Sequence, residues 1–278
     1  MAKVKSTIYA QGIDNRKPVP KVSAIKKTGT REWAKSNVNI QLGCERDCRY
    51  CYARSNAVRF KWADNKSWST PIINQQAVDM NYGRKRGVVM FPSTHDITPN
   101  NYNECMVVIL KLLDAGNQLL IVSKPNLDCI GPMCERLVNY KKQIEFRFTI
   151  GSARDDVLAF WEPGAPGFEE RLKCLGRAHY LNYRTSVSAE PFLDDSVENL
   201  YIRCFPYVTE SFWIGTLRQF NRRVDRSTIT VEQMYDYVTP LLACQQKNPV
   251  RRMYEKMNGQ PLIKWKDSIR EMLSIDDT

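Results

Sequence analysis

Short apolar segments alternate with helix-like segments along most of the chain. The apolar segments lie at 37–42, 87–91, 118–122, 144–150, 183–188 and 207–215. In the helix expected at 100–115, Cys105, Ile109 and Leu112 fall on one face, and Gly116 is placed to end it. Short apolar strands that alternate with helices predict a parallel sheet with both faces covered. Six such units favour an α/β fold of the partial (βα)6 TIM-barrel type over a doubly wound sheet.

The two ends of the chain depart from this alternation. Residues 11–36 are rich in Lys, Pro, Gly and Ser, and Pro18 and Pro20 break any helix there, so residues 1–36 are expected to form an extended basic N-terminal arm. Residues 37–227 would form the barrel, and residues 228–278 are expected to add a helical C-terminal extension. In either α/β fold the chemistry lies on loops at the carboxyl ends of the strands. The polar segments at 43–52, 92–98, 123–126, 151–155 and 189–195 follow the predicted strands in this way.

The composition excludes a wholly disordered protein and a membrane-spanning one. Apolar residues make up 43% of the 278 residues, which is enough for a sizeable core, so wholesale disorder is excluded. The longest apolar run, from Cys105 to Leu110, is far shorter than the roughly 20 residues of a membrane span. The first residues contain no apolar stretch typical of a secretory signal, so we expect a cytoplasmic protein without membrane association.

The charge is strongly and unevenly positive. Lys and Arg number 41 against 30 Asp and Glu, a net charge of +11. Residues 1–36 hold nine basic residues against Asp14 and Glu32, and a second basic stretch covers 247–270. Such clusters favour a polyanionic partner, nucleic acid before an anionic membrane surface, with a merely solvated surface as the alternative. A further basic run, which could follow a phosphate backbone, consists of Arg218, Arg222, Arg223 and Arg226.

One loop concentrates three of the nine cysteines. Cys44, Cys48 and Cys51 stand within eight residues directly after a predicted strand. Thiolates are soft ligands that select zinc, Cu(I) or iron–sulfur clusters. A structural zinc site usually takes four ligands in two separated pairs, but the chain has no second Cys-x-x-Cys pair, and His95 and His179 are remote from the loop. Three closely spaced thiolates suit instead a [4Fe–4S] cluster with one iron left open for a small molecule.

Four segments carry a resemblance to a known family. The loop GCERDCRYCYA resembles that of the radical S-adenosylmethionine (SAM) superfamily. Together with FPSTHDITP, LLIVSKP and LAFWEPGAPGFEERL, it looks like the spore-photoproduct-lyase-like branch, over about residues 37–215. The resemblance implies that the open iron binds SAM through its methionyl amine and carboxylate. SAM is then cleaved to methionine and a 5′-deoxyadenosyl radical, which takes hydrogen from the substrate. It also implies an electron donor such as flavodoxin or ferredoxin.

The resemblance further implies roles for individual residues. Cys44, Cys48 and Cys51 would bind the cluster. Lys124 would pair with the SAM carboxylate, because a carboxylate in a dry barrel needs a cation. The remaining expected SAM contacts are Tyr50 near the adenine, Ser93, Thr94 and Asp96 near the amine, Thr149 and Ser152 near the ribose, and Glu190 near the ribose or amine. Candidate catalytic residues are Tyr52, His95 and Glu210.

The reaction expected from these features is a lyase or isomerase reaction on a nucleic-acid base. Photoproduct lyases carry a cysteine hydrogen donor shortly before the Asp of the second-strand loop, where this chain has Ser93, Thr94 and His95. We therefore expect rearrangement or modification of a thymine-derived pyrimidine in DNA, of the hypermodified kind found in virus DNA, over thymine-dimer repair. Two further functions are compatible with the residues. One is a radical SAM enzyme acting on a peptide or small metabolite, and the second is a zinc-stabilised nucleic-acid-binding module without catalysis.

Overall fold

The computed structural model describes residues 28–276 and contains a seven-stranded parallel sheet. The strands follow one another across the sheet in chain order. They are β1 (Ser36–Asn37), β4 (Val88–Phe91), β5 (Gln118–Ser123), β6 (Ile144–Thr149), β7 (Arg184–Ala189), β8 (Ser211–Ile214) and β9 (Ile263–Trp265). The two edge strands, β1 and β9, are not paired with each other, so the sheet is an open, partial barrel. The predicted α/β fold of the partial-barrel type is therefore confirmed.

The core follows from the apolar pattern of the central strands. Phe91, Ile121 and Phe146 pair side by side on β4, β5 and β6, and all three are fully buried. This pairing in chain order brings the carboxyl ends of the strands to one end of the barrel. The loops that follow the strands therefore meet there.

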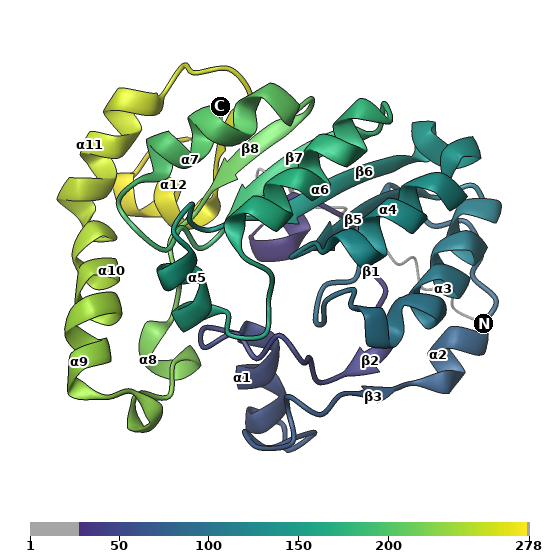
Figure 1. Cartoon of the computed structure of the whole chain (residues 1–278), viewed down its shortest axis with the longest axis horizontal. Coiled ribbons are helices and arrows are strands. Elements are labelled where there is room, and N and C mark those ends of the chain that lie inside the picture. Colours follow the sequence, from purple (N-terminus) through teal and green to yellow (C-terminus); the bar gives the residue numbers. More distant parts are fainter. Residues whose placement is uncertain (1–27, 277–278) are drawn as a thin grey trace, which may run out of the picture.

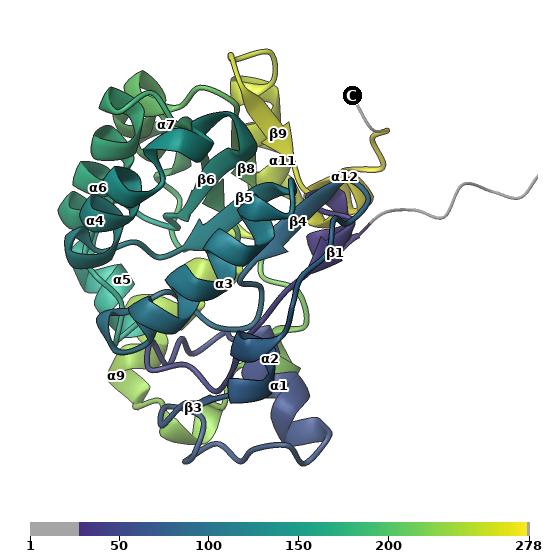
Figure 2. The ribbon, with the colours of Figure 1, turned by 90° about the vertical axis from the view of Figure 1, so that its right-hand side faces the viewer.

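Helices cover the outer face of the sheet between the strands. Among them are α3 (Tyr102–Asp114), α4 (Leu127–Arg136), α5 (Asp155–Trp161), α6 (Phe168–Tyr180) and α7 (Val197–Cys204). Helices α4, α6 and α7 lie side by side on this face (Figures 1 and 2). The helix predicted at 100–115 is present as α3, with Cys105, Ile109 and Leu112 buried and Gly116 at a φ of +78° just after its end. Short 3₁₀ turns are η2 (Pro99–Asn101), η3 (Val138–Gln143) and η4 (Phe205–Tyr207).

The first predicted strand, 37–42, divides into two elements. Its start belongs to β1, whereas β2 (Gln41–Leu42) pairs with β3 (Ile72–Ile73) in a separate antiparallel sheet. Asn39 stands at the division, and its side-chain Oδ1 accepts hydrogen bonds from the backbone N–H groups of Ser93 and Thr94. This polar anchor, which the apolar pattern of neighbouring residues does not reveal, ends the strand. Two helices belong to the same part of the chain, α1 (Tyr52–Arg59) and α2 (Gln75–Asp79).

The C-terminal segment is mostly helical, as predicted, but it also supplies β9. Its helical elements are α8 (Phe220–Arg223), η5 (Arg226–Thr228), α9 (Val231–Gln233), a π-helix (Met234–Val238), α10 (Thr239–Cys244), α11 (Lys247–Met257) and α12 (Asp267–Leu273). Helices α9, α10 and α11 form a column along one side of the molecule (Figure 1). Three residues with two apolar side chains are too short a signal to predict β9, which is fixed by its pairing with β8.

The predicted N-terminal arm is described only in part. Residues 1–27 lie outside the described residues, and residues 28–36 form η1 (Gly29–Glu32) and the start of β1. Within residues 28–276, no helix combines the length and the apolar character that crossing a membrane requires.

Candidate active site

A cavity of about 510 Å³ lies at the carboxyl ends of the strands. This volume is within the usual range for small-molecule and cofactor sites. Twelve of the fourteen residues singled out from the sequence line it, namely Cys44, Cys48, Tyr50, Cys51, Tyr52, Ser93, Thr94, His95, Asp96, Lys124, Thr149 and Glu190. The loops that follow β2, β4, β5 and β7, together with the last residue of β6, thus contribute to one site.

Two of the singled-out residues do not line this cavity. Ser152 is fully buried, and its hydroxyl donates to Asp194 while accepting from the backbone N–H of Arg154. It therefore orders the loop after β6. Glu210, which was expected near the carboxyl end of the last predicted strand, is exposed and directly precedes β8 at its amino end. This expectation is wrong. The predicted strand covers residues 207–215 and so includes Glu210, whereas β8 begins only at Ser211 and leaves Glu210 before its amino end.

The cysteine loop is held by backbone contacts with the turn after α5. The Arg49 N–H donates to the Trp161 carbonyl at 2.8 Å, and Arg46 and Gly164 exchange two hydrogen bonds. At its start, Gly43 has a φ of +90°, and a Cβ there would lie 2.7 Å from the Trp68 carbonyl oxygen. Glycine is thus required where the chain turns into the loop.

Cys44, Cys48 and Cys51 all line the cavity, and their thiols are soft donors of the type that binds iron–sulfur clusters. Among the described residues, no three Cys, His, Asp or Glu side chains converge closely enough to hold one metal ion. Burial, reinforced by the Asp96 charge, raises the pKa of Cys44 to about 12, and burial also raises the pKa of Cys48. Burial thus disfavours the thiolate forms of Cys44 and Cys48 in this wall.

A buried carboxylate, Glu162, holds two residues of the cavity wall. Its side chain is fully buried, pairs with Arg171 at 2.6 Å, and accepts a hydrogen bond from the Tyr50 hydroxyl. The Lys124 ammonium lies 3.9 Å from the same carboxylate and 5.8 Å from the centre of the Tyr50 ring. Burial opposes the ionisation of Glu162, but the charges of Arg171 and Lys124 outweigh it and lower its pKa. Glu162 thus fixes both Lys124 and Tyr50.

Asp96 is satisfied within the chain, whereas Arg46 is not. The Asp96 carboxylate accepts from the Ser123 hydroxyl and from the backbone N–H of Lys124. Arg46, which lines the cavity, is 6% exposed, and its Nε and Nη2 donate no hydrogen bond, although Nε lies 3.5 Å from Asp96. Arg46 is thus ion-paired with Asp96 but retains donor capacity that an anion in the cavity could use. No sequence motif indicates this candidate anion contact.

The candidate catalytic residues His95 and Tyr52 both bond to backbone. His95 Nε2 accepts from the Ile40 N–H at 3.1 Å, and Nδ1 lies 3.0 Å from the Asp96 carbonyl, so Nδ1 carries the proton. Burial lowers the pKa of His95, which keeps the ring neutral. With both nitrogens occupied, His95 holds the loop instead of transferring protons. The Tyr52 hydroxyl donates to the Ser93 carbonyl, and its ring faces the cavity beside Arg223.

Glu190 lies at the side of the cavity nearest the C-terminal segment. Its carboxylate is 3.4 Å from the fully buried Lys266 ammonium, which also pairs with Glu32 at 2.5 Å. Burial raises the pKa of Glu190 against the opposing effect of Lys266. The sequence analysis missed this contact, because Lys266 stands 76 residues after Glu190 in a segment without a motif.

Two relatives match little more than half of the chain. No family model matches it. An uncharacterized protein of Acidianus two-tailed virus is 26% identical over 171 residues, which cover 57% of this chain and 55% of that protein. An uncharacterized protein of Methanocaldococcus jannaschii is 25% identical over 175 residues, which cover 61% of this chain and 64% of that protein. The chain thus spans less than two thirds of the length of these relatives.

Two solved structures share the fold over most of the chain. Streptococcus suis SuiB bound to S-adenosylmethionine gives a TM-score of 0.52 at 9% identity, covering 87% of this chain and 53% of SuiB. A spore photoproduct lyase variant with bound AdoMet and dinucleoside spore photoproduct gives a TM-score of 0.53 at 14% identity, covering 83% of this chain and 80% of the lyase chain. At such identities the likeness concerns the fold alone. The chain therefore shares a partial-barrel fold with these two structures.

Proposed function

We propose that this protein is a radical SAM enzyme that rearranges, modifies or repairs a nucleic-acid base in a lyase or isomerase reaction. The observation that carries the proposal is that three cysteines of one loop share a cavity with the Lys124 ammonium and the Arg46 guanidinium. The fold supports it, since SuiB and spore photoproduct lyase are both solved with SAM bound.

In this proposal Cys44, Cys48 and Cys51 hold a [4Fe–4S] cluster. When bound and reduced by a donor such as flavodoxin or ferredoxin, the cluster supplies the electron that cleaves SAM to methionine and a 5′-deoxyadenosyl radical. The chain itself binds and orients SAM. Lys124, fixed by Glu162, and Arg46, with two unbonded donors, neutralise the methionyl carboxylate.

The other cavity residues orient the rest of SAM. Asp96 acts through the loop that it orders, because its carboxylate already accepts hydrogen bonds from Ser123 and Lys124. Further candidates for contact with SAM are Tyr50, Ser93, Thr94, Thr149 and Glu190.

The substrate proposed is a thymine-derived pyrimidine in DNA. The net charge of +11 favours a polyanion, and spore photoproduct lyase is solved with a dinucleoside photoproduct. SuiB is solved with its precursor peptide, so a peptide is the second candidate, which the basic charge disfavours. A modified thymine of the kind found in virus DNA agrees with a relative encoded by a virus.

Return of hydrogen to the product would not need a cysteine. The 93–95 segment contains none, and Cys204 is fully buried in α7 and does not line the cavity. The product radical would instead regain hydrogen from 5′-deoxyadenosine, or from Tyr52 at the cavity wall. In the first case SAM is regenerated, and Cys204→Ala remains active.

The cluster assignment is tested on protein prepared anaerobically. We expect brown protein with about four irons and four sulfides per chain, which converts SAM to 5′-deoxyadenosine when reduced with dithionite. Replacement of Cys44, Cys48 or Cys51 by Ala should abolish both the colour and SAM cleavage. Cys134→Ala, which alters a buried cysteine of α4 away from the cavity, is the matched control and should retain both. Colourless protein with one zinc per chain would overturn the proposal.

A further inference from the structure

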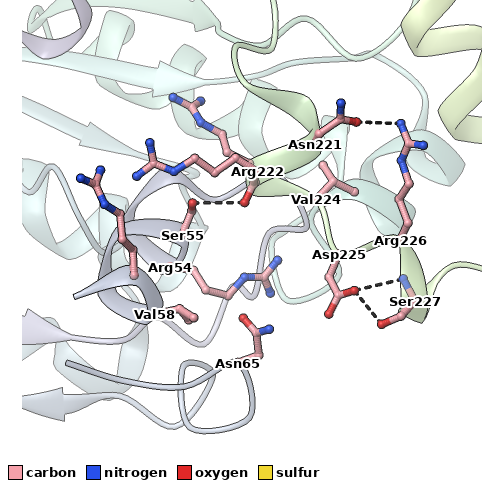
Figure 3. A pocket seen from close by; sticks show the side chains of 12 residues that line it. Arg54, Ser55, Val58, Asn65, Asn221, Arg222, Val224, Asp225, Arg226 and Ser227 are labelled. Atoms are coloured by element: carbon pink, nitrogen blue, oxygen red, sulfur yellow. Dashed lines mark hydrogen bonds between the residues drawn. The ribbon is translucent and has the colours of Figure 1, made fainter. Parts of the chain in front are cut away.

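A second hollow, separate from the barrel cavity, lies between α1 and the segment 221–227. It has a volume of about 800 Å³, and α1 and α8 lie next to each other at its wall (Figure 3). Five of its lining residues are arginines, namely Arg54, Arg59, Arg222, Arg223 and Arg226. We call it the arginine cleft.

The positive charge of the arginine cleft is largely uncompensated. Its one lining carboxylate, Asp225, accepts hydrogen bonds from the backbone N–H and the hydroxyl of Ser227 (Figure 3). Arg54 pairs with Asp47 at 2.8 Å. Within residues 28–276, the other four arginines of the cleft form no ion pair with a carboxylate, and Arg222 and Arg226 donate only to neutral groups. Several guanidinium groups held close together without acidic partners favour the binding of phosphates.

An exposed pair of aromatic rings continues from one end of the cleft. Phe60 and Trp62 are 50% and 64% exposed, and their rings stack with centroids 5.1 Å apart. The Arg59 guanidinium lies 4.9 Å from the centre of the Phe60 ring and so connects this pair to the cleft. Exposed aromatic rings beside a basic groove are the combination that binds single-stranded nucleic acid, because every base has a face that can stack.

The cleft also adjoins the barrel cavity. Arg223 lines both, and its guanidinium lies 5.8 Å from the centre of the Tyr52 ring, which faces the barrel. Arg223 therefore stands between the two hollows, and a strand bound in the cleft would have to pass it to follow a path into the barrel. A base stacked within a duplex could not follow such a path, whereas one in a single strand could.

We propose that the arginine cleft binds the phosphodiester backbone of a single-stranded nucleic acid, with a base stacked on Phe60 and Trp62. Arg223 then holds the phosphate at the junction, so that the neighbouring base enters the barrel past Tyr52. The entry of a base into the barrel rests on the proposed function, whereas the binding of the strand to the cleft does not.

The first test measures binding by the full chain with a fluorescein-labelled oligothymidylate of about 12 nucleotides. The variant Arg222→Ala/Arg226→Ala alters two exposed side chains. We expect its affinity to fall about tenfold or more at 0.1 M salt. The negative slope of log affinity against log salt should become shallower by about 1.4, because two phosphate contacts are lost. Arg251→Ala/Arg252→Ala removes the same charge from the exposed side of α11 and should change the affinity less than threefold. Equal affinities of the cleft variant and the wild type would refute the cleft as the site.

The second test separates stacking from charge. Trp62→Ala should weaken binding of the same oligothymidylate about fivefold or more and leave the salt slope unchanged, since it removes a stacking surface and no charge. A duplex of equal length should bind more weakly than the single strand. Oligouridylate of the same length serves to show whether the strand is DNA or RNA. A polyglutamate peptide that binds as tightly as oligothymidylate would contradict the proposal.

The binding of a strand to the arginine cleft and the proposed function can be tested independently of each other. Cluster-loaded Arg222→Ala/Arg226→Ala protein should still cleave SAM without substrate, because neither arginine lines the barrel cavity. If the wild type binds the strand but neither holds a cluster nor cleaves SAM, the proposed function is wrong and the cleft assignment stands. If the wild type cleaves SAM but binds the strand no better than the cleft variant, only the cleft assignment is wrong.

Discussion

Among the described residues that line the barrel cavity, Lys124 is the only lysine. Replacing it by Ala should weaken SAM binding about ten- to a hundredfold, because a hydrogen bond to a charged partner contributes about 1.5–3 kcal/mol. Glu162 keeps Arg171 and Tyr50 as partners in this variant, so the wall should persist and the iron content should not change. Equilibrium dialysis with labelled SAM, together with iron analysis, measures both quantities.

Arg46→Ala provides the comparison for this prediction. If SAM affinity is unchanged in Lys124→Ala but falls in Arg46→Ala, the carboxylate binds the guanidinium with the two unbonded donors. A loss of iron in Lys124→Ala would mean that Lys124 supports the cluster loop instead of SAM.

At the scale of single residues, the motifs predicted those site residues that can be recognised from neighbouring positions in the sequence. The three cysteines and Lys124 follow strands, and their positions at the cavity come from the strand order alone. Arg46 was missed because one arginine among 41 basic residues gives no signal until its burial and its missing partners are known. Glu162 was missed because its segment has the composition of a turn, and only its pairing with Arg171 and Lys124 gives it a role.

At the scale of elements, the turn after α5 sets the position of the cysteine loop. A Cβ on Gly164 would lie 2.3 Å from the Glu45 carbonyl oxygen and 3.0 Å from the Arg46 Cα, and neither backbone atom can move without displacing the loop. Gly164→Ala should therefore lower the free energy of unfolding by about 1–3 kcal/mol and reduce the iron retained per chain. Urea unfolding and iron analysis of anaerobic protein measure these effects.

Gly131→Ala is the matched control. Gly131 lies within α4, and a Cβ there would meet nothing within 4 Å. This substitution should leave the iron content unchanged and change stability by less than about 1 kcal/mol, because Pro132, which disfavours a helical conformation for a preceding residue with a Cβ, offsets the helix propensity of alanine. Normal iron retention in Gly164→Ala would show that the loop adapts without its contact with the turn.

Elements were predictable where apolar periodicity is long and strong. The strands β5 and β6 and the helices α3 and α6 lie where the pattern placed them. The strands β3 and β9 were not predicted, and the separate pairing of β2 was not predicted either, because these strands have two or three residues each and depend on partners distant in sequence. The apolar pattern cannot supply this information, since register and pairing are properties of the folded chain.

At the scale of the whole molecule, the two ends of the described chain meet at the open side of the barrel. Element η1, which precedes β1, contacts α12, which follows β9. The fully buried Lys266 ammonium pairs with Glu32 at 2.5 Å, donates to the Gly29 carbonyl, and lies 4.2 Å from the centre of the Trp33 ring. Because Gly29 and Trp33 also line the cavity, this contact forms part of the cavity wall.

Lys266→Met is therefore expected to destabilise the protein by about 3 kcal/mol. Removing one partner of a buried ion pair usually costs about 3–5 kcal/mol, and the lower value applies because Glu32 retains Arg270 at 2.7 Å. Glu32→Gln in the Lys266→Met background should recover part of the loss, because it removes one of the two carboxylates, Glu32 and Glu190, that Lys266 neutralises. Urea unfolding of the wild type, the two single variants and the double variant gives the coupling energy. Strictly additive losses would show that Lys266 and Glu32 act independently, and that the two ends of the chain close the barrel wall through their apolar contacts alone.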